Sequence, residues 1–134
     1  MWRSGMMFHS RRLALLLLAA AVLTACGEEA AGPYLDYAGG GFVFNYRTAN
    51  HYYGLVVRQK KPLPEASSFE VRFEVPGGEQ VQREPANAGR LQYKFQTDEL
   101  EGIEAEHPYR VVVILRAAGG QEIERLEKSF TTTV

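Results

Sequence analysis

The chain has 134 residues, of which 15 are lysine or arginine, 16 are aspartate or glutamate and one is cysteine. Three of the basic residues lie near the N-terminus and precede an apolar run, so the remainder carries a net charge of about −4. That charge argues against nucleic acid, or an anionic lipid surface, as the main partner. A single cysteine excludes a disulfide within the chain and a metal site made of cysteines.

The N-terminal segment has the layout of a secretory signal. Arg3, Arg11 and Arg12 supply positive charge, and residues 13–23 form an unbroken apolar run. A membrane-spanning helix needs about 20 apolar residues, so this run is short for a span. We therefore expect residues 1–25 to be a signal peptide that is removed.

The residues that end this segment, Leu23-Thr24-Ala25-Cys26, resemble the lipobox of bacterial lipoproteins. The resemblance implies cleavage between Ala25 and Cys26, diacylglycerol on the Cys26 sulfur, and usually a further acyl chain such as palmitate on the new amino terminus. Two or three acyl chains hold a protein stably on a membrane, whereas one holds it marginally. The alternative is an uncleaved membrane helix with an incidental cysteine.

The lipobox resemblance also implies a location. A lipid-anchored protein of this kind lies in the cell envelope. Gly27 follows the cysteine where an aspartate favours retention in the inner membrane of Gram-negative lipoproteins. We therefore expect the outer membrane, facing the periplasm, if the host is Gram-negative.

The segment after the cysteine is rich in small, acidic and glycine residues, which predicts that residues 26–41 are a flexible tether. Tyr34, Leu35 and Tyr37 interrupt this composition. They either pack back onto the following domain or form a small aromatic contact point. The domain itself is expected over residues 42–134.

Residues 42–134 show seven short stretches of strand character separated by turn signals. Phe69, Val71 and Phe73 alternate with charged residues, which is typical of an antiparallel strand with one wet face. The polar stretch 79–84 indicates a sheet edge, and a slip in alternation between Ile123 and Leu126 indicates a bulge. The expected strands cover residues 41–48, 53–57, 69–75, 79–84, 91–96, 109–116 and 121–133.

Seven short strands without helical segments predict an all-β fold, an antiparallel immunoglobulin-like β-sandwich. Residues 103–133 also resemble the last third of a fibronectin type III domain. The matching features are Ile103 six residues before Tyr109, the Y-x-V-x-V pattern that begins at Tyr109, the Gly119-Gly120 turn and the closing threonines. The resemblance implies a tyrosine corner, in which the Tyr109 hydroxyl bonds back to the preceding loop backbone. The family's early core tryptophan is absent.

Three side chains that are expected to face outward are candidate contacts. Val112 and Ile114 lie on the face opposite the expected core of their strand, and Tyr52 lies opposite Tyr53. Tyr46 and Tyr53 are expected in the core. The leading hypothesis is a domain that binds a protein partner, either by strand addition at a sheet edge or through Val112 and Ile114. The alternative is an envelope glycan or other ligand stacked on Tyr52.

No motif for catalysis is present, so the chain is not expected to be an enzyme or to carry a cofactor. His51 and His107 are expected in loops, outside any nucleophile motif. Residues 98–106 hold five acidic side chains but lack the order of a calcium-binding EF-hand, so a solvated loop is expected and no metal site. A hydrolase remains a third and weaker hypothesis.

Overall fold

The structure is a computed structural model that describes residues 32–134. Over this range the chain contains strands and no helix, and accordingly no helix that is long and apolar enough to cross a membrane. The seven strands are β1 (Leu35–Asn45), β2 (Asn50–Gln59), β3 (Ser68–Val75), β4 (Gly78–Pro85), β5 (Gln92–Gln96), β6 (Tyr109–Arg116) and β7 (Glu122–Phe130).

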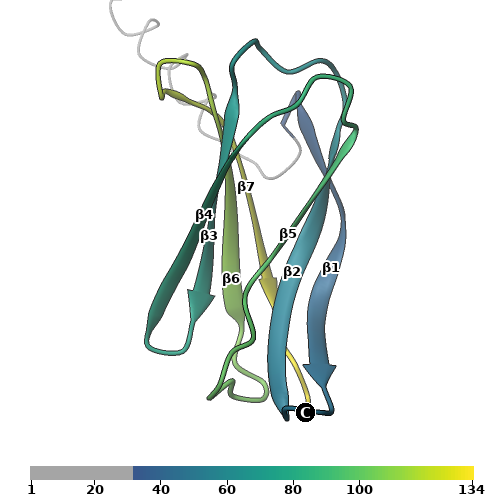
Figure 1. Ribbon diagram of the computed structural model, residues 1–134, viewed down its shortest axis with the longest axis vertical. Coiled ribbons are helices and arrows are strands. Elements are labelled where there is room, and N and C mark those ends of the chain that lie inside the picture. Colours follow the sequence, from purple (N-terminus) through teal and green to yellow (C-terminus); the bar gives the residue numbers. More distant parts are fainter. Residues whose placement is uncertain (1–31) are drawn as a thin grey trace, which may run out of the picture.

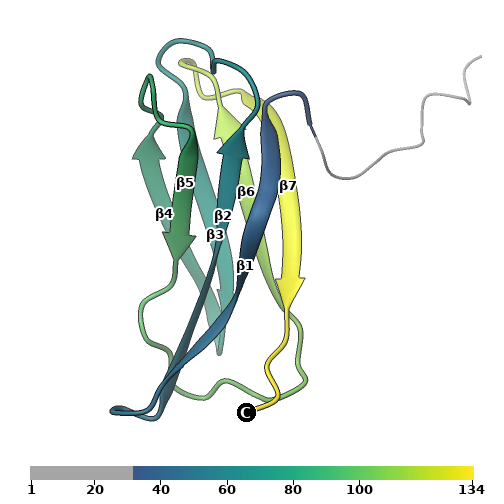
Figure 2. The same ribbon diagram turned by 90° about the vertical axis from the view of Figure 1, so that its right-hand side faces the viewer.

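The strands form two antiparallel sheets packed face to face (Figures 1 and 2). Sheet A has the order β1-β2-β5, and sheet B has the order β4-β3-β6-β7. The expected immunoglobulin-like sandwich is therefore confirmed. The predicted position of the polar strand β4 at a sheet edge is also confirmed.

The core lies between the sheets and comes from alternate residues of the central strands. In β2, β3 and β6 the core positions predicted by alternation are buried, and in β3 and β6 some side chains of the opposite face are buried as well. Their rings and branched side chains pack across the gap, as Phe69 does against Tyr93 with ring centroids 4.5 Å apart. The core residues include Tyr53, Leu55, Val57, Phe69, Val71, Phe73, Tyr93, Phe95, Tyr109, Val111, Val113 and Leu115.

The first strand begins earlier than the sequence predicts. β1 starts at Leu35 and not at Gly41, and the Leu35 side chain is 0% exposed. Its backbone N–H donates to Glu124 of β7 at 2.9 Å, as does that of Tyr34. Residues 35–41, expected in a tether, are therefore part of the sandwich. Of the two alternatives for Tyr34, Leu35 and Tyr37, the structure shows packing onto the domain.

Three side chains lie elsewhere than predicted. Tyr46 is 89% exposed because β1 ends at Asn45 and a loop carries Tyr46 away from the core. Leu91, which alternation with Tyr93 and Phe95 predicts on the buried face of its strand, is 65% exposed because it precedes the first residue of β5. His51, expected in a solvated turn, is buried in β2, where Nε2 lies 2.9 Å from the carbonyl oxygen of Val134.

Two finer features agree with the sequence prediction. In the β6–β7 pairing, Leu115 faces Glu124 while Arg116 faces Glu122, so Ile123 is the extra residue of a bulge. Glu124 shares the inner face of β7 with Leu126 and is buried, and the bulge lets the neighbouring Ile123 pack against the core as well. The backbone N–H of Glu104 donates to the Tyr109 hydroxyl at 2.9 Å, which is the bond expected of a tyrosine corner.

Candidate functional site

Val112 and Ile114 do not form an exposed patch. They lie on the outer face of sheet B, as alternation predicts, but they are only 7% and 2% exposed. Their cross-strand neighbours are long charged residues: Arg72 and Glu127 flank Val112, and Glu70 and Arg125 flank Ile114. The aliphatic stems of such side chains cover apolar surface while their charged ends stay in water. The predicted exposure of Val112 and Ile114 is therefore wrong, and little of either side chain is available to a partner in this arrangement.

The charges on this face pair with one another. The Glu70 carboxylate lies 2.8 Å from Arg72, 3.1 Å from Arg83 and 3.2 Å from Arg116. Arg110 lies 2.7 Å from Glu127, and Arg125 lies 2.9 Å from Glu122. A partner that covered this face would have to remove water from a network of paired charges. The free energy of that desolvation exceeds the electrostatic gain unless the partner's polar groups match the network closely. The outer face of sheet B is thus a poor candidate for docking.

The central carboxylate of this network predicts a pH dependence of stability. Burial alone would raise the pKa of Glu70, but hydrogen bonds from Arg116 and Arg72 outweigh it and hold the pKa below its ordinary value of 4.5. A lowered pKa stabilises the fold above that ordinary value, and the stabilisation is lost as pH falls toward the folded-state pKa. Glu70→Gln should therefore cost about 2 kcal/mol at pH 7, and much less at pH 3.

Urea denaturation of wild type and Glu70→Gln at both pH values measures this difference. Glu79→Gln is the matched control, because Glu79 is more exposed and contacts Arg72 alone within this network. A cost of Glu70→Gln that was equal at pH 7 and pH 3 would contradict the role given to the ionised carboxylate.

Strand addition, the other expected docking mode, meets partly occupied edges on sheet A. On the β5 edge, Gln82 of β4 donates to the Gln96 carbonyl at 2.5 Å and Arg90 donates to the Gln92 carbonyl at 3.1 Å. On the β1 edge, Glu124 holds the first residues of the strand, and Tyr37 packs against Phe130 of β7. At these positions of β5 and β1, few backbone N–H and C=O groups are therefore free to pair with an incoming strand.

The outer face of sheet B also holds a hollow of about 300 Å³, but charged side chains such as Arg72, Glu79 and Arg110 line most of it. The outer face of sheet A holds a groove of another kind, which glycines and apolar side chains line for the most part. The groove has a volume of about 300 Å³ and crosses all three strands. In register, Gly41 pairs with Gly54, which pairs with Gln96, and Val43 pairs with Tyr52. The lining residues are Gly39, Gly40, Gly41, Phe42, Val43, Tyr52, Gly54, Leu55, Val56, Lys94 and Gln96.

Glycines make the floor of the groove. Gly39 and Gly41 have φ of +150° and +152°, a conformation that favours glycine, and a Cβ at either would meet nothing within 4 Å. A Cβ at Gly54 would lie 2.2 Å from the carbonyl oxygen of Phe95. The floor is therefore bare backbone, and the space above it is open because no side chain fills it.

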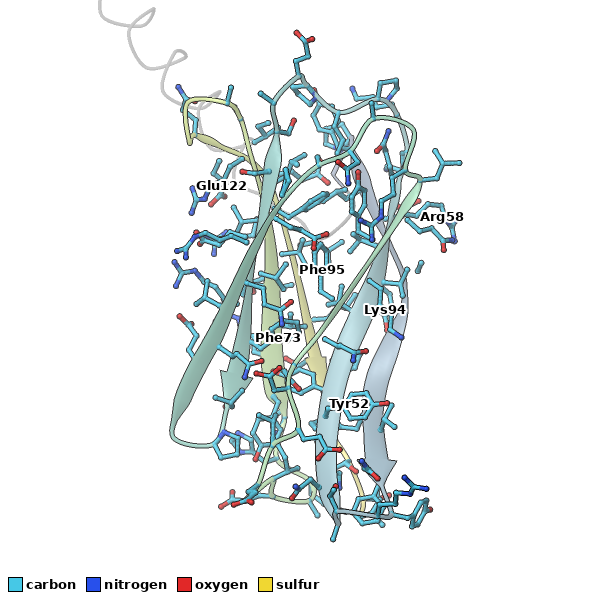
Figure 3. The ribbon with its side chains drawn as sticks, in the orientation of Figure 1. Tyr52, Arg58, Phe73, Lys94, Phe95 and Glu122 are labelled. Atoms are coloured by element: carbon cyan, nitrogen blue, oxygen red, sulfur yellow. The ribbon has the colours of Figure 1, made fainter. Side chains whose placement is uncertain are left out.

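Tyr52 is the largest side chain of the groove, and it is half-buried on the outer face of β2. Lys94 lines the same groove and is exposed, as is Arg58 farther along β2. The sticks of Figure 3 show Tyr52, Lys94 and Arg58 on one side of the molecule, while Phe73 and Phe95 point between the sheets. The face thus joins an aromatic ring to two cations, although residues 32–134 as a whole carry more acidic than basic residues.

The histidines and the acidic loop do not gather into a site. His107 Nε2 lies 2.9 Å from Glu74 of β3, and His51 contacts the chain end. Within residues 32–134 there is no group of three or more histidine, cysteine, aspartate or glutamate residues that could hold a metal ion. The groove on sheet A is therefore the candidate site that the geometry favours.

Comparison with known proteins adds no assignment: no family model matches the sequence, and no curated protein matches it. Ala25 and Cys26, where the sequence predicts cleavage and lipidation, lie outside the described residues. Of the three predicted contact residues, only Tyr52 lies in the groove. The sequence analysis missed the glycine floor, whose signal was the glycine run at residues 39–41 together with Gly54.

Proposed function

We propose that this chain is a lipid-anchored, non-enzymatic interaction domain of the cell envelope that binds a protein partner across the outer face of sheet A. The lipobox-like segment ending at Cys26 supports the anchor, and through it an envelope location. In a Gram-negative host that location would be the outer membrane, facing the periplasm. The groove floored by Gly39, Gly41 and Gly54 and walled by Tyr52 is the observation that carries the binding role.

The chemistry of the groove indicates what the partner presents. A bare glycine floor admits close approach of a flat group or an extended backbone, and Tyr52 offers contact area at a low entropic cost. Lys94 and Arg58 favour an acidic side chain beside that group. We therefore expect an extended segment that carries an apolar or aromatic residue next to an aspartate or glutamate.

Partner binding should depend on Tyr52. Tyr52→Ala should weaken partner binding by about tenfold or more, because a tyrosine central to an interface is typically worth 2 kcal/mol or more. The variant should remain folded, since Tyr52 lies outside the core. Partner recovered with the detergent-extracted lipoprotein, quantified by mass spectrometry, measures the effect.

Tyr46→Ala is the matched control, because Tyr46 is an exposed tyrosine at the end of the same hairpin and does not line the groove. It should leave binding within about twofold of wild type, well below the loss expected of a central contact. Equal binding by Tyr52→Ala and wild type would contradict the proposal.

An envelope glycan is the second candidate ligand, and one observation favours it. The Tyr52 ring lies in one groove with the Gln96 amide and the Lys94 amine, a combination that can stack on a sugar ring and bond its hydroxyl groups. Retention on isolated envelope glycan tests this reading. Loss of that retention in Tyr52→Ala, with protein recovery intact, would favour glycan over a protein partner.

We also propose that the sandwich is a divergent relative of fibronectin type III domains. The Tyr109–Glu104 bond and the arrangement of three strands against four support this relationship. It does not by itself imply an activity, because one fold serves many functions.

A further inference from the structure

The two ends of the sandwich differ in composition. The chain enters β1 at one end, where the β2–β3, β4–β5 and β6–β7 loops also lie, and it finishes at the other end with the β1–β2 loop and the long β5–β6 segment (Figures 1 and 2). Backbone bonds fix this grouping: Lys60 donates to the Tyr34 carbonyl at 2.8 Å, and Gln59 donates to the Leu91 carbonyl at 2.8 Å. We call these the entry end and the far end.

The entry end presents apolar surface. Leu91 is 65% exposed there, and it lines a cavity of about 430 Å³ together with Leu63. Prolines and alanines supply most of the remaining wall; the other lining residues are Gln59, Pro62, Pro64, Glu65, Ala66, Ala86, Asn87, Ala88 and Gly89. An exposed leucine beside an apolar hollow is a feature that binding surfaces use.

Charge divides between the ends. The entry-end loops carry Lys60, Lys61 and Arg90 against Glu65, and two acids of the adjoining strands pair with these cations: Asp36 lies 3.7 Å from Lys60 and Glu84 lies 3.9 Å from Arg90. The far end carries Arg47 and His107 against five acids, which are Asp98, Glu99, Glu101, Glu104 and Glu106. The net negative charge of the domain is thus concentrated away from the end at which the chain enters. The total charge of the domain disfavours an anionic lipid surface, but the entry end itself carries no excess of negative charge.

The chain length keeps this end close to the predicted anchor. Leu35 begins β1, and Cys26 lies nine residues earlier in the sequence. Nine residues span at most about 30 Å even when fully extended. The start of β1 therefore stays within about 30 Å of the acylated cysteine. The far end is separated from the start of β1 by the length of the sandwich, so it can lie much farther from the cysteine.

We propose that the entry end rests on the lipid surface to which Cys26 is attached, with Leu63 and Leu91 at the boundary of headgroups and acyl chains and Lys61 and Arg90 near lipid phosphates. This inference rests on the proposed lipid anchor. Glu28 and Glu29 oppose the basic loops, so burial of the two leucines is the main attraction and the cations orient the domain. The sandwich then stands upright, and the groove of sheet A faces sideways.

The test places a fluorescent reporter at each end of the full-length lipoprotein. The dye NBD, whose emission depends on its surroundings, is attached to Leu91→Cys and, separately, to Glu101→Cys at the far end. The proteins are reconstituted in phosphatidylethanolamine–phosphatidylglycerol vesicles with and without nitroxide-labelled lipid. We expect blue-shifted emission and at least twofold quenching at position 91, and neither at position 101.

A second pair of variants tests the cations. In the labelled Leu91→Cys background, Lys61→Glu should reduce quenching, whereas Lys128→Glu on β7 should not. Equal, water-like emission at positions 91 and 101 would overturn the proposal. Shielded emission at position 91 without quenching by nitroxide lipid would also overturn it, because a protein or a second copy of the chain would then cover this end.

The failure of the anchor is distinguishable from the failure of this inference. The mass of the Cys26 peptide and flotation with the vesicles report lipidation directly. An unmodified peptide from a protein that does not float would overturn the anchor, and this inference with it. An acylated protein that floats, but whose label at position 91 remains in water, would overturn the inference alone.

Discussion

Replacing Gly54 by alanine should destabilise the domain by about 3 kcal/mol or more. Its Cβ would lie 2.2 Å from the carbonyl oxygen of Phe95 and 2.7 Å from the Cβ of Gln96. Gly54 pairs with Gln96 across the β2–β5 ladder, so both neighbours belong to a paired strand that can shift only by losing backbone bonds. Urea denaturation of the unlipidated chain from residue 27 measures the loss.

Gly78→Ala is the control for this substitution. Gly78 also lies in a strand, its φ is not positive, and a Cβ there would meet nothing within 4 Å. Its cost should stay below about 1 kcal/mol, the range of an open strand position. Equal stability of Gly54→Ala and Gly78→Ala would contradict the close contact between the β2 and β5 backbones at Gly54.

Removing the carboxylate of Glu124 should cost about 3 kcal/mol. The side chain is 7% exposed, and its two oxygens accept the backbone N–H groups of Tyr34 and Leu35 at 2.9 Å each. Glu124→Ala leaves both donors without this acceptor where the chain enters the sandwich. Denaturation measures the global loss, and limited proteolysis should show earlier cleavage before β1.

Two further variants define the cause. Glu124→Gln keeps one oxygen as an acceptor and should lose about half as much stability. Glu122→Ala, two residues away and exposed, should change stability by no more than about 0.5 kcal/mol. Equal stability of Glu124→Ala and Glu122→Ala would contradict the role of Glu124 in holding β1 to β7.

Alternation predicted the strands whose two faces differ most. In β2 and β5 burial alternates from residue to residue along the strand, as the apolar pattern predicts. The same pattern placed Val112 and Ile114 on the outer face correctly but could not show that they are covered. Cover depends on long charged side chains from strands that are distant in sequence, which only the cross-strand register brings together.

The glycine floor was hidden for a related reason. Glycine and alanine at residues 38–41 suit both a flexible tether and a strand that needs open space, and composition does not separate the two. Pairing with Gly54 of β2 distinguishes them. Glu124 was hidden too, because an acidic side chain in a strand usually faces water, whereas Glu124 lies on the same inner face of β7 as the buried Leu126.

Photo-crosslinking in the cells that make this protein would test directly whether a protein partner binds across the groove of sheet A. The photoreactive amino acid p-benzoylphenylalanine replaces Tyr52 in the groove of sheet A or, as the comparison, Ser129 on the outer face of sheet B. We expect one discrete protein adduct from position 52, absent from position 129 and reduced when Lys94 is changed to glutamate. An adduct from position 129 with none from position 52 would contradict binding in the groove of sheet A.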